Sequence, residues 1–323
     1  MTKKIITTLI KFLVSGGILY FLFSNMDMEL FFHDLKNVSP YAILFVAVFF
    51  VCLQAVSAFR WSIILKKDVD VPYRKLLAIY FIGMFFNNFL PTMVGGDIIK
   101  GLYLYRESGK GGVSVASIFM DRYSGFSALI IITTVALITG YALIKDTALP
   151  GFFFLLVGGY TAASLVIWVG PLHSWAMKIF ARIHFYGINH KIDALYKTLM
   201  GYKGHKDILV KILLISFVVQ AGVIVGYYIL ARSLGIEVRL AYFFFFIPLA
   251  TAITMVPITV GGLGIREGAF VYLFTMVGAT KAQAISLSLI WYAVMVAVSM
   301  IGGAAFIKMG GHARDLTEAA EDL

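Results

Sequence analysis

Apolar runs long enough to cross a lipid bilayer constrain this chain more than any other feature. Six such runs, each about 20 residues or longer, lie at Ile5–Ser24, Tyr41–Leu65, Val113–Tyr141, Pro150–Gly170, Ile208–Ala231 and Ala282–Ile307. A helix of about 20 apolar residues crosses the hydrocarbon core and satisfies its own backbone polar groups there. Of the 323 residues, 60% are hydrophobic and 14% are charged, which excludes a soluble globular domain. The sequence therefore predicts an all-α polytopic membrane protein.

Two further apolar segments, Leu76–Tyr105 and Leu240–Phe274, are interrupted near the middle by proline and paired glycines. The interruptions read PTMVGG from Pro91 and PITVGG from Pro257. Proline kinks or ends a helix, and irregular backbone at membrane depth occurs only where protein or a water-filled cavity satisfies it. Each segment is therefore predicted to be a re-entrant hairpin or a broken helix. If both segments cross the membrane fully, the chain has eight spans.

Lys and Arg side chains separate these options, because cytoplasmic loops collect them. With both interrupted segments treated as re-entrant, one side of the membrane carries 16 Lys and Arg and the other carries five. The richer side holds both termini and the loops 66–75, 106–112 and 171–207. We therefore expect an integral protein of the cytoplasmic membrane with both termini in the cytoplasm. The net charge of +10 favours anionic membrane lipids as partners, and not nucleic acid.

The two interruptions repeat at a constant offset of 166 residues, about half the chain. The same offset carries the second and third apolar runs close to the fifth and sixth. We expect one membrane domain over 1–323, with a first repeat at 1–145, a second at 146–310, a basic amphipathic cytoplasmic loop at 171–207 and a short cytoplasmic tail at 311–323. Three crossings per repeat invert the second repeat relative to the first, as in many secondary transporters. Two unrelated kinked helices are the alternative explanation.

Charged residues expected at membrane depth cluster around the interruptions. Such charges are unfavourable in a bilayer and are therefore functional candidates. The six nearest the interruptions are Asp97, Lys100, Asp121, Arg122, Arg266 and Glu267. Arg60 and Trp61, near the end of the second run, are more simply explained as an interfacial anchor, although Arg60 is also kept as a binding candidate. A structural alternative is that neighbours neutralise each other, as Asp97–Lys100, Asp121–Arg122 and Arg266–Glu267.

These residues suit the binding of an anionic headgroup. A helix that begins after a glycine pair presents free backbone amides and a positive dipole end to phosphate, and arginine binds phosphate through a planar fork. The expected binding residues are Arg266, Arg122, Lys100, Asn87, Asn88, Gly95, Gly96, Gly261, Gly262 and Arg60. The acids Asp97, Asp121 and Glu267 would hold these cations or carry a proton. We expect neither a metal nor another cofactor.

The motifs together resemble one known family. The matching motifs are Arg60-Trp61, Asn87-Asn88, Gly95-Gly96-Asp97, Asp121-Arg122 and Gly261-Gly262-x-Gly264-x-Arg266-Glu267. They are similar to those of the flippase-like integral membrane family, which includes the transmembrane domain of lysylphosphatidylglycerol synthases. The resemblance runs from about Lys4 to Lys308 and implies movement of a lipid between leaflets. The synthases carry a soluble acyltransferase domain after the membrane part, whereas this chain ends about 15 residues after its last expected span, so synthase activity is not expected.

The leading functional hypothesis is a flippase or transporter for a phospholipid or a polyprenyl-phosphate-type lipid, without enzymatic activity. One alternative is an intramembrane enzyme that transfers a lipid headgroup, and another is a membrane partner that docks a glycosyltransferase. A homo-oligomer also fits the sequence. No motif of a P-loop, a zinc protease or a serine hydrolase is present. An inverted duplication favours transport, because a transporter needs a site that both sides of the membrane can reach.

Overall fold

The computed structural model describes residues 2–24, 26–89, 95–144, 149–182, 188–254, 259 and 261–310, and within them the side chains outside 2–12, 139–149 and 178–195. The described part is all α, with thirteen helices and no strand. The helices are α1 Thr2–Ser24, α2 Met28–Asn37, α3 Pro40–Leu65, α4 Tyr73–Phe89, α5 Gly95–Ser108, α6 Gly111–Ile144, α7 Leu149–Trp168, α8 Gly170–Arg182, α9 Ile188–Lys203, α10 Lys206–Ser233, α11 Leu240–Thr254, α12 Ile265–Thr275 and α13 Lys281–Lys308. The predicted all-α polytopic class is confirmed.

Five helices in the described part are long and apolar enough to cross a membrane, namely α3, α6, α7, α10 and α13. Their ends lie within three residues of the corresponding predicted runs. The first predicted run, Ile5–Ser24, lies within helix α1. The described side chains of α1 begin at Leu13, and Leu13–Ser24 forms a shorter apolar helix.

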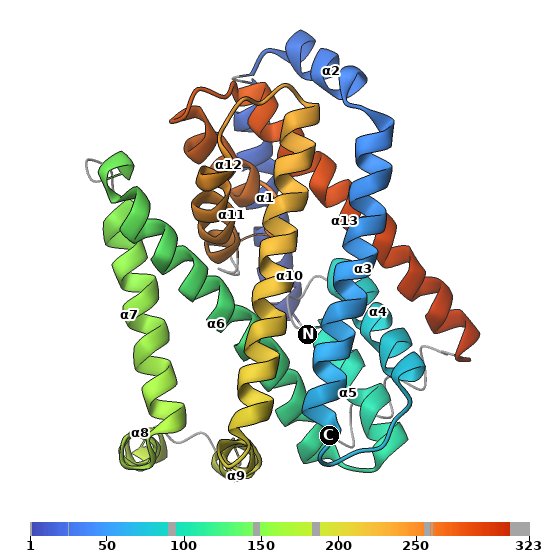
Figure 1. Ribbon diagram of the computed structural model, residues 1–323, viewed down its shortest axis with the longest axis vertical. Helices are drawn as coiled ribbons and strands as arrows, with labels where there is room; N and C mark the ends of the chain where they lie inside the picture. Colours follow the sequence, from blue (N-terminus) through green and yellow to red (C-terminus); the bar gives the residue numbers. More distant parts are fainter. Residues whose placement is uncertain are drawn as a thin grey trace.

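Each interrupted segment folds as two short helices that pack on each other, α4 with α5 and α11 with α12. We call the end of the molecule that holds α8 and α9 the α8–α9 end, and the other the α2 end (Figure 1). Helix α3 ends and α6 begins at the α8–α9 end, so the hairpin between them enters and leaves there (Figure 1). The hairpin of α11 and α12 likewise returns to the α2 end, where α10 ends and α13 begins (Figure 1). The two hairpins therefore enter from opposite ends.

Helix length agrees with re-entrant hairpins. Helices α4, α5, α11 and α12 contain 17, 14, 15 and 11 residues, whereas a perpendicular span needs about 20. The alternative with two additional uninterrupted spans is therefore wrong. Pro91 and Pro257, which mark the interruptions, lie outside the described residues.

The packing of the first hairpin recurs around the second. Helix α4 packs against α3 and α13, and α11 packs against α10 and α6. Helix α5 packs against α6, and α12 packs against α13. These pairs are related by the 166-residue offset, which carries Pro40 at the start of α3 to Lys206 at the start of α10. The symmetry favours the predicted inverted repeat, whose boundaries at 1–145 and 146–310 stay a prediction.

Glycines allow the first hairpin to pack closely on its neighbours. A Cβ atom at Gly96 would overlap the carbonyl oxygen of Gly83, and one at Gly302 would overlap the carbonyl oxygen of Phe81. Glycine is therefore required where α5 meets α4 and where α13 meets α4. These contacts fix the start of α5 inside the bundle.

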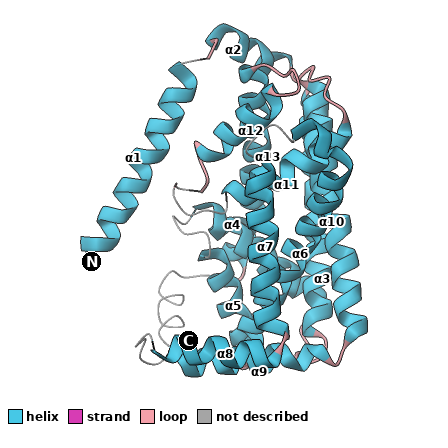
Figure 2. Cartoon of the chain, turned by 90° about the vertical axis from the view of Figure 1, so that its left-hand side faces the viewer, coloured by secondary structure: helices cyan, strands magenta, loops and turns pink. Residues whose placement is uncertain are grey.

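The predicted basic loop at 171–207 contains two helices. Helices α8 and α9 lie across the lower edge of the molecule, at a steep angle to the long helices (Figure 2). Tyr202 of α9 donates a hydrogen bond from its hydroxyl group to the carbonyl oxygen of Ile64 at 3.2 Å, which attaches this layer to the end of α3. The side chains of Lys178, Arg182 and Lys191 lie outside the description. Membrane binding by this layer stays a prediction.

Candidate functional site

Asp121 of α6 joins two cations from other helices. Its Oδ1 lies 2.8 Å from Nη2 of Arg60 on α3, and its Oδ2 lies 3.0 Å from Nζ of Lys100 on α5. All three side chains are buried, with exposed fractions of 3%, 6% and 5% in that order. Arg60 also donates from Nη1 to Oγ of Ser216 on α10 at 2.8 Å. The buried carboxylate thus connects α6 to α3 and α5, and Arg60 extends the network to α10.

Aromatic rings complete the surroundings of Lys100. Its Nζ lies 4.1 Å from the ring centroids of both Trp61 and Tyr80, a distance at which a desolvated cation is attracted to the π-face. The indole Nε1 of Trp61 donates to Oγ of Ser117 at 3.1 Å. The expectation that Arg60 and Trp61 form an interfacial anchor is wrong, because both are buried. Asp121, which is distant in sequence, provides the anion that allows Arg60 to be buried.

Asp97 and Arg122 form a third ion pair in this region. Nε of Arg122 lies 2.8 Å from Oδ2 of Asp97, and Nη2 donates to Oδ1 at 2.9 Å. The Arg122 side chain is 58% exposed. The predicted ion pairs Asp97–Lys100 and Asp121–Arg122 are therefore wrong. Asp97 pairs with Arg122, and Asp121 pairs with Arg60 and Lys100. Consecutive residues of α6 point in different directions, so Asp121 and Arg122 pair with different partners on neighbouring helices.

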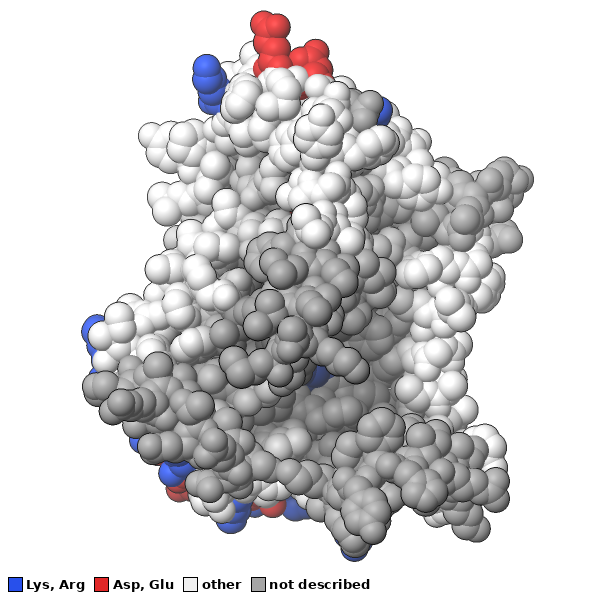
Figure 3. Space-filling model, turned by 180° about the vertical axis from the view of Figure 1, so that it is seen from behind, with Lys and Arg blue, Asp and Glu red and all other residues white. Residues whose placement is uncertain are grey.

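A cavity of about 180 Å³ lies beside these ion pairs. Its polar lining consists of Gln54, Tyr80, Asn87, Asn88, Asp97, Lys100, Asp121 and Arg122. Pockets for drug-sized ligands begin at about 300 Å³, so this cavity fits part of a headgroup and not a whole lipid. Figure 3 shows a hollow in the lower part of the rear face, with basic atoms visible inside it.

The second hairpin carries a more closed charged cluster. Nη2 of Arg266 lies 2.8 Å from Oε1 of Glu267, and the exposed fractions of the two side chains are 10% and 0%. Oγ of Ser288 on α13 donates to the same Oε1 at 3.0 Å, and the guanidinium carbon of Arg266 lies 4.4 Å from the ring centroid of Tyr292. The predicted pair Arg266–Glu267 is confirmed.

Both hairpins bond a backbone amide near the start of their second helix with a side chain of their own. Oδ1 of Asn87 accepts from the Gly96 amide at 2.9 Å, and Oε2 of Glu267 accepts from the Gly264 amide at 2.6 Å. At these two positions the backbone amide, which was predicted to be free, is already bonded. The amide oxygen of Asn87 and the carboxylate of Glu267 therefore occupy the place at each amide where a phosphate oxygen was expected.

The two glycine pairs have different backbone roles. Gly95 and Gly96 are the first residues of α5. Gly261 and Gly262 instead form a turn before α12, with φ angles of +60° and +77° that non-glycine residues rarely adopt. The 166-residue offset therefore relates the two sequences, but the second helix begins later than the first.

The ion pairs around Asp121 and Asp97 form a first cluster, and those around Glu267 form a second. The 166-residue offset also relates the cations of these two clusters. Lys100 corresponds to Arg266, and each lies over an aromatic ring. Arg122 corresponds to Ser288, so the second cluster has a neutral hydroxyl where the first has a guanidinium group. The first cluster is consequently the one with an exposed cation.

The sequence did not indicate the neutral side chains that surround these cations and the cavity. They are Ser216, Ser288, Tyr80 and Tyr292, all of which contact the cations or line the cavity. Ser288 carried a signal, because it lies 166 residues after Arg122. The tyrosines carried none, because aromatic residues are frequent throughout the chain. In the described part, no group of three or more His, Cys, Asp or Glu side chains is placed to hold a metal ion.

Long apolar helices around two re-entrant hairpins, each with buried charges, define an integral membrane protein of the polytopic α-helical class. The chain belongs to the family described as the lysylphosphatidylglycerol synthase TM region, which matches residues 8–303. The predicted family is therefore confirmed.

Relatives of this chain occur in two archaea. It is 24% identical to a UPF0104 membrane protein of Pyrococcus horikoshii over 273 residues, which cover 76% of this chain and 80% of the relative. Two UPF0104 membrane proteins of Methanothermobacter thermautotrophicus are 23% identical over 270 residues and 26% identical over 307 residues. These matches cover 77% and 85% of this chain, and 79% and 86% of the relatives.

Proposed function

We propose that this protein moves a phospholipid or a polyprenyl-phosphate-type lipid between the membrane leaflets, and that Arg122 binds the headgroup phosphate. The observation that carries the proposal is the exposure of Arg122. Its side chain is 58% exposed, whereas those of Arg60, Lys100 and Arg266 are at most 10% exposed. Arg122 is therefore the cation of the two clusters best placed to meet a ligand.

The pairing of Arg122 with Asp97 suits an exchange of anions. Two nitrogens of the guanidinium group face the two carboxylate oxygens, in the forked geometry by which arginine also binds phosphate. A phosphate that replaced Asp97 would keep Arg122 paired throughout. Asn87 and Asn88 line the same cavity and provide further polar groups for the headgroup.

The remaining charges act as positioning groups. Asp121 holds Lys100 and Arg60, and Glu267 holds Arg266 against α13 through Ser288. In this proposal, Asp97 occupies the phosphate position when no lipid is bound. The α8–α9 end faces the cytoplasm, in agreement with the excess of Lys and Arg expected on that side.

Two hairpins that enter from opposite ends support movement across the membrane. A transport site must be reached in turn from both sides. The first cluster has a cavity and an exposed cation, while the second is closed around Glu267. This difference is expected of one state of an alternating cycle. A headgroup transferase and a glycosyltransferase-docking protein stay alternative predictions.

A lipid-translocation assay tests the role of Arg122. Protein in liposomes with a fluorescent phospholipid is compared with Arg122→Gln and Arg122→Lys by the rate at which dithionite quenches inner-leaflet lipid. We expect about a tenfold or greater loss for the Gln variant, since charged hydrogen bonds contribute about 1.5–3 kcal/mol, and partial activity for the Lys variant. Lys197→Gln, an exposed cation of α9, is the control. Wild-type rates in Arg122→Gln would contradict the assignment.

A further inference from the structure

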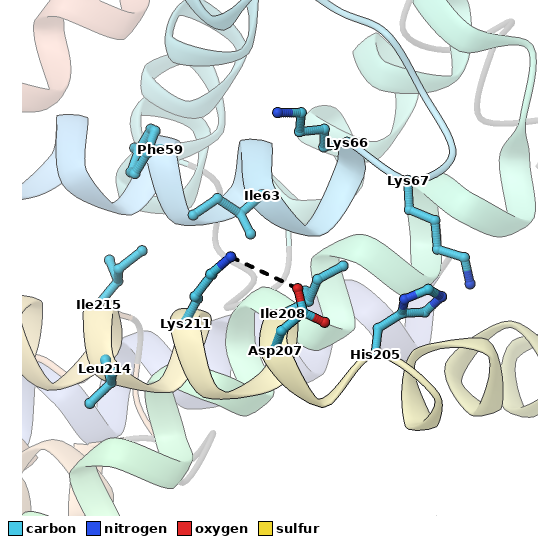
Figure 4. Close-up of a pocket in the computed structure, with 10 residues that line it drawn as sticks. All are labelled: Phe59, Ile63, Lys66, Lys67, His205, Asp207, Ile208, Lys211, Leu214 and Ile215. Carbon is cyan, nitrogen blue, oxygen red and sulfur yellow. Dashed lines mark ion pairs between the residues drawn. The ribbon is translucent and has the colours of Figure 1, made fainter.

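A second cavity lies between the end of α3 and the start of α10, on the α8–α9 end of the molecule. Its volume is about 710 Å³ (Figure 4). Nearer the middle of the bundle the same two helices are in tight contact, because Gly222 of α10 leaves room only for the side chain of Leu53 of α3. Helices α3 and α10 therefore touch at mid-height and enclose a groove near their ends, which we call the α3–α10 groove.

The α3–α10 groove is amphipathic along its length. Figure 4 shows Ile63 of α3 and Ile215 of α10 facing the space between the helices, with Phe59 farther along α3. Three basic residues contribute to the lining toward the helix ends, namely Lys66, Lys67 and Lys211, and of these Lys211 extends into the space between the helices in Figure 4. Asp207 is the acidic residue of this lining. An apolar wall that continues into a cationic rim matches the profile of a membrane phospholipid.

The cations differ in how firmly they are held. Lys211 lies 3.8 Å from Asp207, and both side chains are more than 60% exposed. Exposed pairs of this kind contribute at most about 1 kcal/mol, so Lys211 can turn to another anion. Lys67 donates to the carbonyl oxygen of Gly201 at 3.0 Å and is held toward α9. Lys66 and Lys211 are thus the residues to test.

We propose that the α3–α10 groove binds an anionic phospholipid from the leaflet at the α8–α9 end. An acyl chain lies along Phe59, Ile63 and Ile215, and the phosphate lies between Lys66 and Lys211. Three lysines against one aspartate give the rim a net positive charge, which selects an anionic headgroup over a zwitterionic one. This site is distinct from the Arg122 cavity and does not depend on the proposed transport function.

The position of the groove connects it to the first cluster. Phe59 borders the groove, while the next residue, Arg60, turns inward to Asp121 and bonds Ser216 of α10. The Arg60–Ser216 hydrogen bond therefore joins the same two helices, α3 and α10, between which the lipid would bind. A bound lipid acts on the contact between α3 and α10, and not directly on Arg122.

Native mass spectrometry of the detergent-purified protein tests this site. The protein is titrated with dioleoyl phosphatidylglycerol and with dioleoyl phosphatidylcholine, and the bound lipid is counted. Lys66→Gln with Lys211→Gln removes the cations, and Ile215→Trp fills the groove while keeping them. Arg74→Gln with Lys197→Gln removes two exposed cations outside the groove lining and serves as the charge-matched control. Arg122→Gln separates this site from the transport cavity.

We expect the wild type to prefer phosphatidylglycerol, and both groove variants to bind it about tenfold more weakly. The control pair and Arg122→Gln should keep wild-type affinity. Equal binding of the two lipids by the wild type would overturn the proposal. Equal weakening in the control pair would do the same, because it would show a general charge effect. If the lysine variant does not fold, Ile215→Trp decides: wild-type affinity in that variant contradicts the groove as the site.

Discussion

At the scale of single residues, burial separates the charges that hold the bundle from the charge that is proposed to meet a ligand. Asp121 has buried partners on both oxygens, whereas the partner of Asp97 is largely exposed. Removing one member of a buried ion pair leaves an uncompensated charge and costs about 3–5 kcal/mol. Exposed pairs contribute about 0–1 kcal/mol. The two aspartates should therefore respond very differently to the same substitution.

We expect Asp121→Asn to lower the unfolding temperature strongly, because it leaves Arg60 and Lys100 buried without their anion. The matched change Asp97→Asn should shift the unfolding temperature little. Thermal unfolding in detergent, followed by size-exclusion chromatography of heated samples, measures both. Similar unfolding temperatures for the two variants would contradict the assignment of Asp121 as the structural centre.

The sequence predicted which charges gather at the hairpins and the pair Arg266–Glu267, but not how the charges around the first hairpin pair. Hydropathy places Asp121 and Arg122 together inside a span, yet the direction of each side chain depends on how α6 is rotated against α5. Arg60 was explained as an anchor because it lies near the end of a span, and only the fold brings Asp121 to it. Pairing across 61 residues has no local signal.

At the scale of elements, the helices were predictable because membrane spans depend on length and hydropathy alone. The five confirmed spans match the apolar runs closely. The interruptions were also visible, since proline and paired glycines are local signals. The return of each hairpin to its own end was inferred from charge, and the start of α12 three residues after Gly262 was not foreseen.

Because the two hairpins enter from opposite ends of the molecule, we expect their flanking residues to face opposite sides of the membrane. Single cysteines at Arg74 and Lys110 flank the first hairpin, and cysteines at Glu237 and Lys281 flank the second. With Cys52, which is exposed, replaced by alanine, an impermeant maleimide should label the first two from one side and the last two from the other. Labelling of Arg74→Cys and Lys110→Cys from opposite sides would show a full crossing.

At the scale of the whole molecule, two oppositely directed hairpins place one open and one closed charged cluster within a single bundle. The lower edge carries α8, α9 and the α3–α10 groove, so the features proposed to bind lipid gather at the end proposed to face the cytoplasm. In the proposed function, the phosphate group is the part of the lipid that Arg122 recognises.

The proposal that Arg122 recognises the lipid phosphate is tested most directly by measuring whether lipid movement depends on a phosphate group. Liposomes containing the protein are supplied with fluorescent phosphatidylglycerol or with fluorescent glucosylceramide, a lipid that has no phosphate. Wild-type protein should move the phospholipid well above the protein-free rate and the glycolipid little, and Arg122→Gln should abolish this preference. Equal movement of both lipids by the wild type, or an unchanged preference in Arg122→Gln, would contradict phosphate recognition by Arg122.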